Sequence, residues 1–196
     1  VGIEGYRTYL RSKAAPWVAS YRWPILFFIA VGFWNTVGAG LLGFAINPPA
    51  SLYFVQGLNL TAAHGHAALF GVYGMLGIGL MLFCLRGLYV PSRHAEALIG
   101  KAFWCLNAGL AMMVFLSLLP AGIYQAAASI TQGLWYARSP EVIHSPVMEF
   151  LVWMRVPGDI VFALGVLALA AYVLKLPGRA PGEVKQAELA SASETA

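Results

Sequence analysis

The chain has 196 residues and a formal net charge of +4, and 60% of its residues are hydrophobic while only 10% are charged. Because soluble domains carry about 25% charged residues, this composition excludes an ordinary soluble globular domain. The alternative is a membrane protein, in which helices of about 20 apolar residues cross the hydrocarbon core of the bilayer.

Four apolar stretches of that length follow one another along the chain. We expect transmembrane helices at about residues 23–46, 58–85, 102–125 and 148–174. The first two contain no Asp, Glu, Lys or Arg, whereas the fourth contains Glu149, Arg155 and Asp159. The predicted fold class is therefore all-α, a polytopic membrane helix bundle with four transmembrane helices.

The predicted domain organisation has three parts. Residues 1–22 form a basic cytoplasmic lead-in, and residues 23–176 form the four-helix transmembrane region. Residues 177–196 are rich in Ala, Ser, Glu and Lys, have no apolar period, and are expected to be a disordered cytoplasmic tail. Because the chain begins at Val1 and nothing before Trp23 resembles a cleavable signal peptide, we expect a C-terminal piece of a longer protein.

The basic residues indicate the orientation in the membrane. All but two of the twelve Lys and Arg residues lie before the first predicted helix, between the second and third, or after the fourth. Those three regions face the same side of the membrane, and the positive-inside rule places that side in the cytoplasm. The exceptions are Arg138, in a loop on the opposite side, and Arg155, within the fourth helix. Membrane orientation therefore explains the positive charge, and no nucleic-acid partner is expected.

Two histidines in the second predicted helix are the main candidates for chemistry. His64 and His66 project about 200° apart on a helix, so they cannot easily chelate one metal ion. They can instead each bind a different cofactor on opposite sides of the helix, and the neighbouring small residues Gly65, Ala67, Ala68, Gly71 and Gly74 leave room for a large planar ligand. Imidazole is a usual axial ligand of heme iron. The structural alternative is two polar histidines that hydrogen-bond to neighbours or water.

Polar residues in the other helices have two interpretations. Arg155 and Asp159 are spaced i,i+4, so they share a helix face and can neutralise each other. Asp159 is also a candidate to accept a hydrogen bond or proton from a substrate, because carboxylates within a membrane are often functional. Pro157 is expected to weaken the helix locally. Interhelical hydrogen bonds are the expected role of Asn35, Asn107 and Ser117.

Several motifs resemble one family. The run HGHAALFGVYGMLGIGLMLFCLR at His64–Arg86 resembles the heme-ligating helix of bacterial nitric oxide reductase, the large catalytic subunit within the heme-copper oxidase superfamily. Similar segments are GFWNTVGAGLLGFAINPP, FWCLNAGLAMMVFLSLLPAGIYQ, GLWYARS and WMRVPGDIVF. Together these segments extend over nearly all of the membrane part. Their sequences are more similar to those of the quinol-dependent, single-chain type.

The resemblance implies specific roles for these residues. His64 is expected to be the axial ligand of a high-spin heme, and His66 the axial ligand of a low-spin heme, both b-type. The family reduces two NO to N2O and water, with quinol as the expected electron donor and Asp159 in the quinol site. The second low-spin heme ligand and the ligands of a non-heme iron belong to upstream helices, so the fragment alone is expected to be inactive.

The resemblance also implies a bacterial cytoplasmic (inner) membrane location, with both termini of the fragment cytoplasmic and the two histidines toward the extracytoplasmic side. Three alternatives remain open from the sequence. The protein could be a cytochrome-c-dependent NO reductase, an oxygen-reducing heme-copper oxidase subunit, or a non-redox membrane transporter or structural subunit.

Overall fold

A computed structural model describes residues 3–4, 6–7, 10, 21–86 and 93–176. Most of the predicted lead-in and all of the predicted tail lie outside the described residues. Four helices are long and apolar enough to cross a membrane, at Arg22–Ile46, Asn59–Leu85, His94–Gln132 and Pro146–Leu174. No strand occurs in the described ranges. The predicted all-α bundle of four transmembrane helices is therefore confirmed, and the chain is a multi-pass membrane protein.

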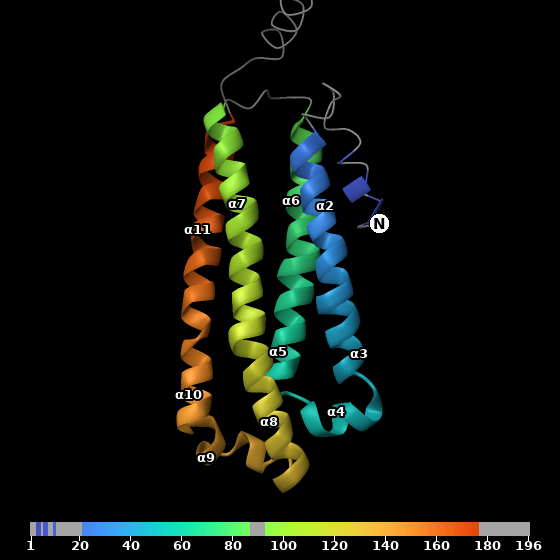
Figure 1. Cartoon of the computed structure of the whole chain (residues 1–196), viewed down its shortest axis with the longest axis vertical. Coiled ribbons are helices and arrows are strands. Elements are labelled where there is room, and N and C mark those ends of the chain that lie inside the picture. The colour runs from blue at the N-terminus through green and yellow to red at the C-terminus, as the bar shows by residue number, and fades with distance from the viewer. Residues whose placement is uncertain (1–2, 5, 8–9, 11–20, 87–92, 177–196) are drawn as a thin grey trace, which may run out of the picture.

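Each of these four spans is built from consecutive helical segments (Figure 1). The first contains α2 (Arg22–Trp34), η2 (Asn35–Leu42) and α3 (Gly43–Ile46), and the short α4 (Pro49–Val55) connects it to the second. The second contains α5 (Asn59–His66), η3 (Ala67–Gly74) and α6 (Met75–Leu85), and the third contains α7 (Arg93–Met112), η4 (Met113–Leu118) and α8 (Leu119–Gln132). The turn η5 (Tyr136–Arg138) and α9 (Pro140–Ile143) lead to the fourth span, formed by α10 (Pro146–Trp153) and α11 (Arg155–Leu174).

The first three spans each contain a wider π-helical segment: η2, η3 and η4. The cause is clearest for η4, because Pro120 follows it and has no N–H to donate to the carbonyl of Leu116 four residues earlier. The segments η2 and η3 each contain two glycines, which permit close approach of a neighbouring helix. Such π-helical turns often mark functional sites, and η3 begins directly after His66.

A proline also explains the break in the fourth span. Pro157 cannot donate a hydrogen bond to the carbonyl of Trp153, and its ring would clash with that carbonyl in a continuous helix. The chain accordingly makes a turn at Met154, and α11 begins at Arg155. The predicted local weakening is confirmed, and it places Arg155 at the start of a new helix.

The third span is the central element of the bundle. In its most apolar 18-residue window 50% of the residues are buried, compared with 17 to 22% in the other three spans. It is also longer than the predicted 102–125, at His94–Gln132. Its polar start is anchored by the indole N–H of Trp23, which donates to Glu96 Oε2 (3.1 Å). At the other end, the Ala-rich run 126–128 favours continuation of the helix.

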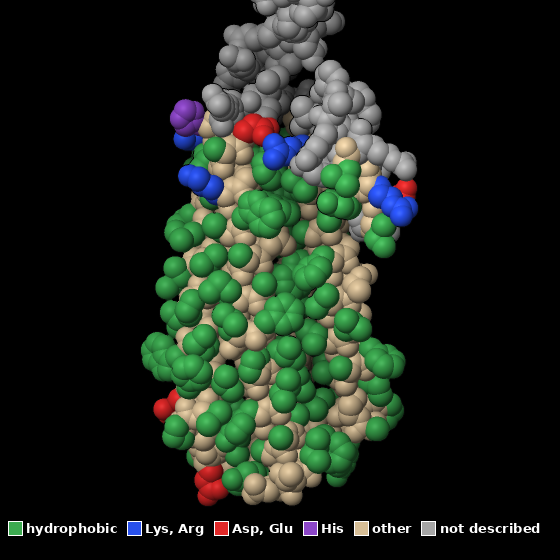
Figure 2. All heavy atoms as spheres, viewed as in Figure 1, with side chains coloured by type: hydrophobic (Ala, Val, Ile, Leu, Met, Phe, Trp, Pro, Cys, Tyr) green, Lys and Arg blue, Asp and Glu red, His purple; other side chains and the backbone are tan. Residues whose placement is uncertain are grey.

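The surface of the bundle suits a lipid environment. Figure 2 shows hydrophobic side chains along the whole visible face, with Lys and Arg gathered at one end. Large apolar residues point outward on different spans, such as Phe44 (79% exposed), Trp104 (69%) and Leu167 (65%). Arg22, Arg86 and Lys175 lie at span termini on one end, which we call the basic end.

Candidate functional site

The ring nitrogens of both candidate histidines have defined roles. His64 Nδ1 lies 2.9 Å from the carbonyl oxygen of Gly38 in η2, and His66 Nδ1 lies 2.9 Å from the carbonyl oxygen of Ala62 in its own helix. A carbonyl can only accept, so Nδ1 carries a proton in both rings, and in the neutral ring Nε2 carries the lone pair. Histidines that bind metals are commonly held in this way, with the far nitrogen donating to a backbone carbonyl.

His64 packs against the first span. A Cβ atom added to Gly43 would lie 3.0 Å from His64 Cε1, so glycine at this position leaves room for the imidazole. One turn earlier, a Cβ added to Gly38 would lie only 2.5 Å from the Cβ of Ala67. The backbones of η2 and η3 are therefore in direct contact beside His64, and the ring is held by another helix at close range.

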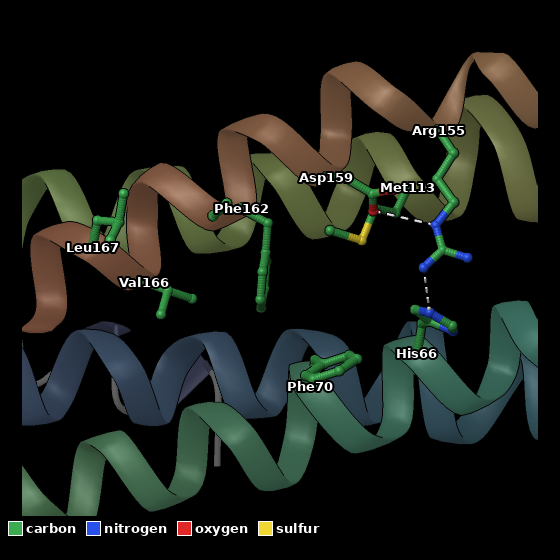
Figure 3. Close-up of a pocket in the computed structure, with 9 residues that line it drawn as sticks. His66, Phe70, Met113, Arg155, Asp159, Phe162, Val166 and Leu167 are labelled. Carbon is green, nitrogen blue, oxygen red and sulfur yellow. Dashed lines mark hydrogen bonds and ion pairs between the residues drawn. The ribbon is translucent and has the colours of Figure 1, made fainter.

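His66 faces the fourth span (Figure 3). The Arg155 guanidinium donates from Nη2 to His66 Nε2 (3.2 Å) and from Nε to Asp159 Oδ1 (3.2 Å). Arginine can only donate, which again requires the lone pair of His66 to be on Nε2. The Arg155 side chain lies between Asp159 and His66 in the close-up, so one cation links the two spans. The predicted i,i+4 ion pair of Arg155 and Asp159 is confirmed.

A pocket of about 510 Å³ opens beside this cluster. Its volume is typical of small-molecule and cofactor sites, which occupy about 300–1,000 Å³. His66, Arg155 and Asp159 form its polar end. The remaining lining is hydrophobic and comes from three spans: Phe70, Met113, Phe162, Ala163, Val166 and Leu167. The pocket therefore suits a ligand with a large apolar body and a polar or charged edge.

The structure brings together some of the predicted site residues and separates others. His66 and Asp159 line one pocket, whereas His64 contacts the first span and is absent from that lining. Asn107 makes the expected interhelical hydrogen bond, accepting from the indole N–H of Trp34 (2.9 Å). Ser117 is buried and Asn35 is exposed. The two histidines thus have different surroundings on one helix.

Sequence reasoning missed several contributors to the site. The Gly38 carbonyl has no side-chain signature, so no residue pattern could reveal it. Phe70 lies one turn after His66, with ring centroids 5.7 Å apart, and that i,i+4 spacing was an available signal. Met113 and Phe162 come from other spans. The described residues contain no group of three or more His, Cys, Asp or Glu that could hold a metal ion.

Comparisons with known proteins agree with the motifs. The model of the family described as cytochrome c and quinol oxidase polypeptide I matches residues 10–161, a range that includes the whole pocket-forming part of α5 and the start of α11. A nitric oxide reductase subunit of Stutzerimonas stutzeri is 28% identical over 158 residues, which cover 74% of this chain and 31% of that relative. The chain therefore spans less than a third of the relative's length. Since the family model matches most of the chain, the protein belongs to the cytochrome c and quinol oxidase polypeptide I family, the membrane oxidoreductases of the heme-copper oxidase type.

Proposed function

We propose that the chain is the C-terminal part of a membrane nitric oxide reductase that reduces two NO to N2O and water. The overall reaction consumes two electrons and two protons. Support comes from the similarity to the nitric oxide reductase subunit of Stutzerimonas stutzeri and from the sequence motif around His64 and His66. Family membership alone supports the coarser class of heme-containing membrane oxidoreductase.

The hydrogen bonds of the two histidines are the main support for this proposal. Both histidines donate from Nδ1 to a backbone carbonyl, so the neutral ring keeps its lone pair on Nε2, and each contacts a different neighbouring span. The lone pair of His66 accepts from Arg155 Nη2, which would have to move aside for a metal to bind. An imidazole is a usual ligand of heme iron, and each heme takes at least one. Two imidazoles prepared in this way on one helix suit two hemes and do not suit one shared metal ion.

Each histidine offers one imidazole to a heme, and a pocket lies beside His66. We propose that His64 Nε2 is the axial ligand of a high-spin heme and His66 Nε2 the axial ligand of a low-spin heme, both b-type. When bound, these hemes supply electron transfer and the iron at which NO is reduced. His66 has an apolar pocket for a macrocycle, and Arg155 provides a cation for the carboxylates that heme carries at its edge. Gly38 orients the His64 ring through its carbonyl oxygen.

We propose quinol as the electron donor and Asp159 as the residue that receives it. A carboxylate that shares a pocket with His66 can accept a hydrogen bond, and then a proton, from a quinol hydroxyl. Arg155 holds the Asp159 carboxylate in place through its Nε. In the cytochrome-c-dependent alternative, Asp159 would act only as the partner of Arg155.

The rest of the site is proposed to come from the upstream part of the same enzyme, because this chain spans 31% of the matched relative. That part would provide the second ligand of the low-spin heme and the ligands of a non-heme iron. The fragment by itself would then be inactive. We place the enzyme in the bacterial inner membrane, with the basic end of the bundle in the cytoplasm and the two histidines nearer the opposite side.

The test is a cofactor and activity analysis of the purified full-length enzyme. The proposal predicts two b-type hemes by pyridine hemochrome, non-heme iron by metal analysis, and conversion of NO to N2O with a reduced quinol as donor. Retention of both hemes after His64→Ala and His66→Ala substitution would contradict the ligand assignment. Absence of heme b would contradict the whole proposal and favour a non-redox membrane subunit.

The family match also favours a second candidate, an oxygen-reducing terminal oxidase. The two functions differ in the metal next to the high-spin heme, which is copper in an oxidase and iron in the proposed reductase. Stoichiometric copper in the intact enzyme, together with oxygen consumption, would therefore replace the nitric oxide reductase assignment with an oxidase assignment.

A further inference from the structure

A hydrogen bond joins the first and third spans about one turn before Gly38, whose carbonyl accepts from His64. The indole N–H of Trp34 donates to Asn107 Oδ1 (2.9 Å), and the Trp34 side chain is only 1% exposed. The amide nitrogen of Asn107 donates to the carbonyl of Phe103 (2.8 Å) and lies 4.0 Å from the sulfur of Met75 in the second span. One amide group therefore contacts the first and second spans as well as its own.

The Trp34 ring is held on several sides. It stacks on Phe115 of the third span, with ring centroids 6.5 Å apart and an interplanar angle of 19°. A Cβ atom added to Gly71 of η3 would lie 2.4 Å from Trp34 Cγ, so the indole rests directly on the η3 backbone. Trp34 is also the last residue of α2, immediately before η2 begins. Its position therefore sets where η2 starts relative to η3.

One turn further along η2 is the residue that orients His64. Gly38 touches Ala67 of η3 and accepts the hydrogen bond from His64 Nδ1 at 2.9 Å. Hydrogen bonds at about 3.6 Å are no longer effective, so a shift of η2 by roughly 0.7 Å would break this contact. The contact between Trp34 and Gly71 and the contact between Gly38 and Ala67 together fix η2 against the helix that carries His64.

We propose that Trp34 and Asn107 are positioning residues for His64. Their hydrogen bond holds η2 in the register that keeps the Gly38 carbonyl on His64 Nδ1, which in turn raises the basicity of Nε2 toward a metal. The orientation of His66 does not depend on the Trp34–Asn107 hydrogen bond, because His66 Nδ1 donates to its own helix. The expected effect on the heme assigned to His64 rests on the proposed function. The heme assigned to His66 is expected to remain unchanged.

The chain contains a matched control for this hydrogen bond. Trp23 donates from its indole to Glu96 Oε2 (3.1 Å), and it lies eleven residues before Trp34 just as Glu96 lies eleven residues before Asn107. The same two spans are thus joined twice by the same kind of donor. Only the Trp34 bond is next to η2, so Trp23→Phe removes an equivalent bond at the basic end without reaching Gly38.

The experiment compares Trp34→Phe with Trp23→Phe in the full-length enzyme with its hemes. Trp34→Phe keeps a stacked ring and removes the donor. We expect the iron–histidine stretch of the reduced high-spin heme, measured by resonance Raman spectroscopy, to move to lower frequency because His64 becomes a weaker ligand. NO reduction is expected to slow by about 10-fold, as for loss of other groups that orient metal ligands. The low-spin heme spectrum stays unchanged, and Trp23→Phe leaves both hemes unchanged.

Two variants of the acceptor complete the test. Asn107→Leu removes the oxygen and is expected to give the same frequency shift as Trp34→Phe, which also covers a failure of Trp34→Phe to assemble. Asn107→Asp retains an oxygen acceptor and is expected to retain the parental frequency. An unshifted frequency in both Trp34→Phe and Asn107→Leu would overturn the inference, as would equal changes at both hemes in Trp34→Phe and Trp23→Phe. Absence of heme from the parent enzyme would instead overturn the proposed function.

Discussion

The two faces of α5 differ in how they hold a histidine. On one face, His64 donates to the Gly38 carbonyl of another span and lies against glycines that bring two helix backbones into contact. On the other face, His66 donates to its own helix and its Nε2 meets Arg155 at the polar end of a pocket. The first environment is formed by the backbone of another span, whereas the second borders a pocket and contains an ion pair.

This difference shows how one short motif can provide two kinds of ligand. A ring oriented by a neighbouring helix depends on helix packing, so its ligand strength responds to changes in the first span. A ring oriented by its own helix is insensitive to that packing, but it shares a pocket with charged groups. The His64 face is therefore sensitive to steric changes, and the His66 face is sensitive to changes of charge.

Removing both rings should have the largest effect. In the full-length enzyme, the double substitution His64→Ala and His66→Ala is expected to abolish binding of both hemes and to reduce NO turnover to background, because no other histidine lies in this helix. Heme content by pyridine hemochrome and an NO electrode measure the two results. His94→Ala, which alters an exposed histidine at the basic end, is the control and should retain full activity. A double variant that keeps either heme would contradict the ligand assignments.

Steric changes should then separate the two faces. Gly38→Ala places a methyl group 2.5 Å from Ala67 Cβ, and overpacking of this kind typically costs about 1–3 kcal/mol. We expect a lower unfolding temperature in detergent and a perturbed heme at His64, with the low-spin heme spectrum retained. Gly77→Ala is the control, because no heavy atom lies within 4 Å of its added Cβ. Equal destabilisation by both substitutions would show that η2 and η3 are not in close contact.

Changing one charge on the His66 face should have a smaller effect. Asp159→Asn weakens acceptance of a quinol hydroxyl, and loss of about 1.4 kcal/mol of such binding raises the KM for quinol about 10-fold. An artificial donor that bypasses the quinol site should give unchanged rates. Glu149→Gln, which alters an exposed carboxylate outside the pocket on the same span, is the control. An unchanged KM for quinol would remove Asp159 from the donor site and leave it as the partner of Arg155.

Features with a local cause were predictable from the sequence. Apolar length identified the four spans, Pro157 predicted a local weakening of the fourth helix, and i,i+4 spacing paired Arg155 with Asp159. Helical periodicity also separated His64 from His66. These predictions succeed because each depends on residues within a single helix.

Features that depend on which helices are neighbours were not predictable. His66 and Arg155 are 89 residues apart, and nothing in either segment identifies the other as its partner. The Gly38 carbonyl is a backbone group common to every residue, so only its contact with His64 reveals its role. The third span was predicted too short because polar residues near its ends, such as Lys101 and Gln125, interrupt the apolar window without ending the helix.

The most direct test of the account compares His64→Ala with His66→Ala as single substitutions in the full-length enzyme. Optical and magnetic spectra of the reduced and oxidised protein distinguish the high-spin heme from the low-spin heme. We expect His64→Ala to lose or alter the high-spin heme alone and His66→Ala to lose or alter the low-spin heme alone. Loss of the same heme in both variants would mean that the two rings serve one cofactor, and it would contradict the central claim.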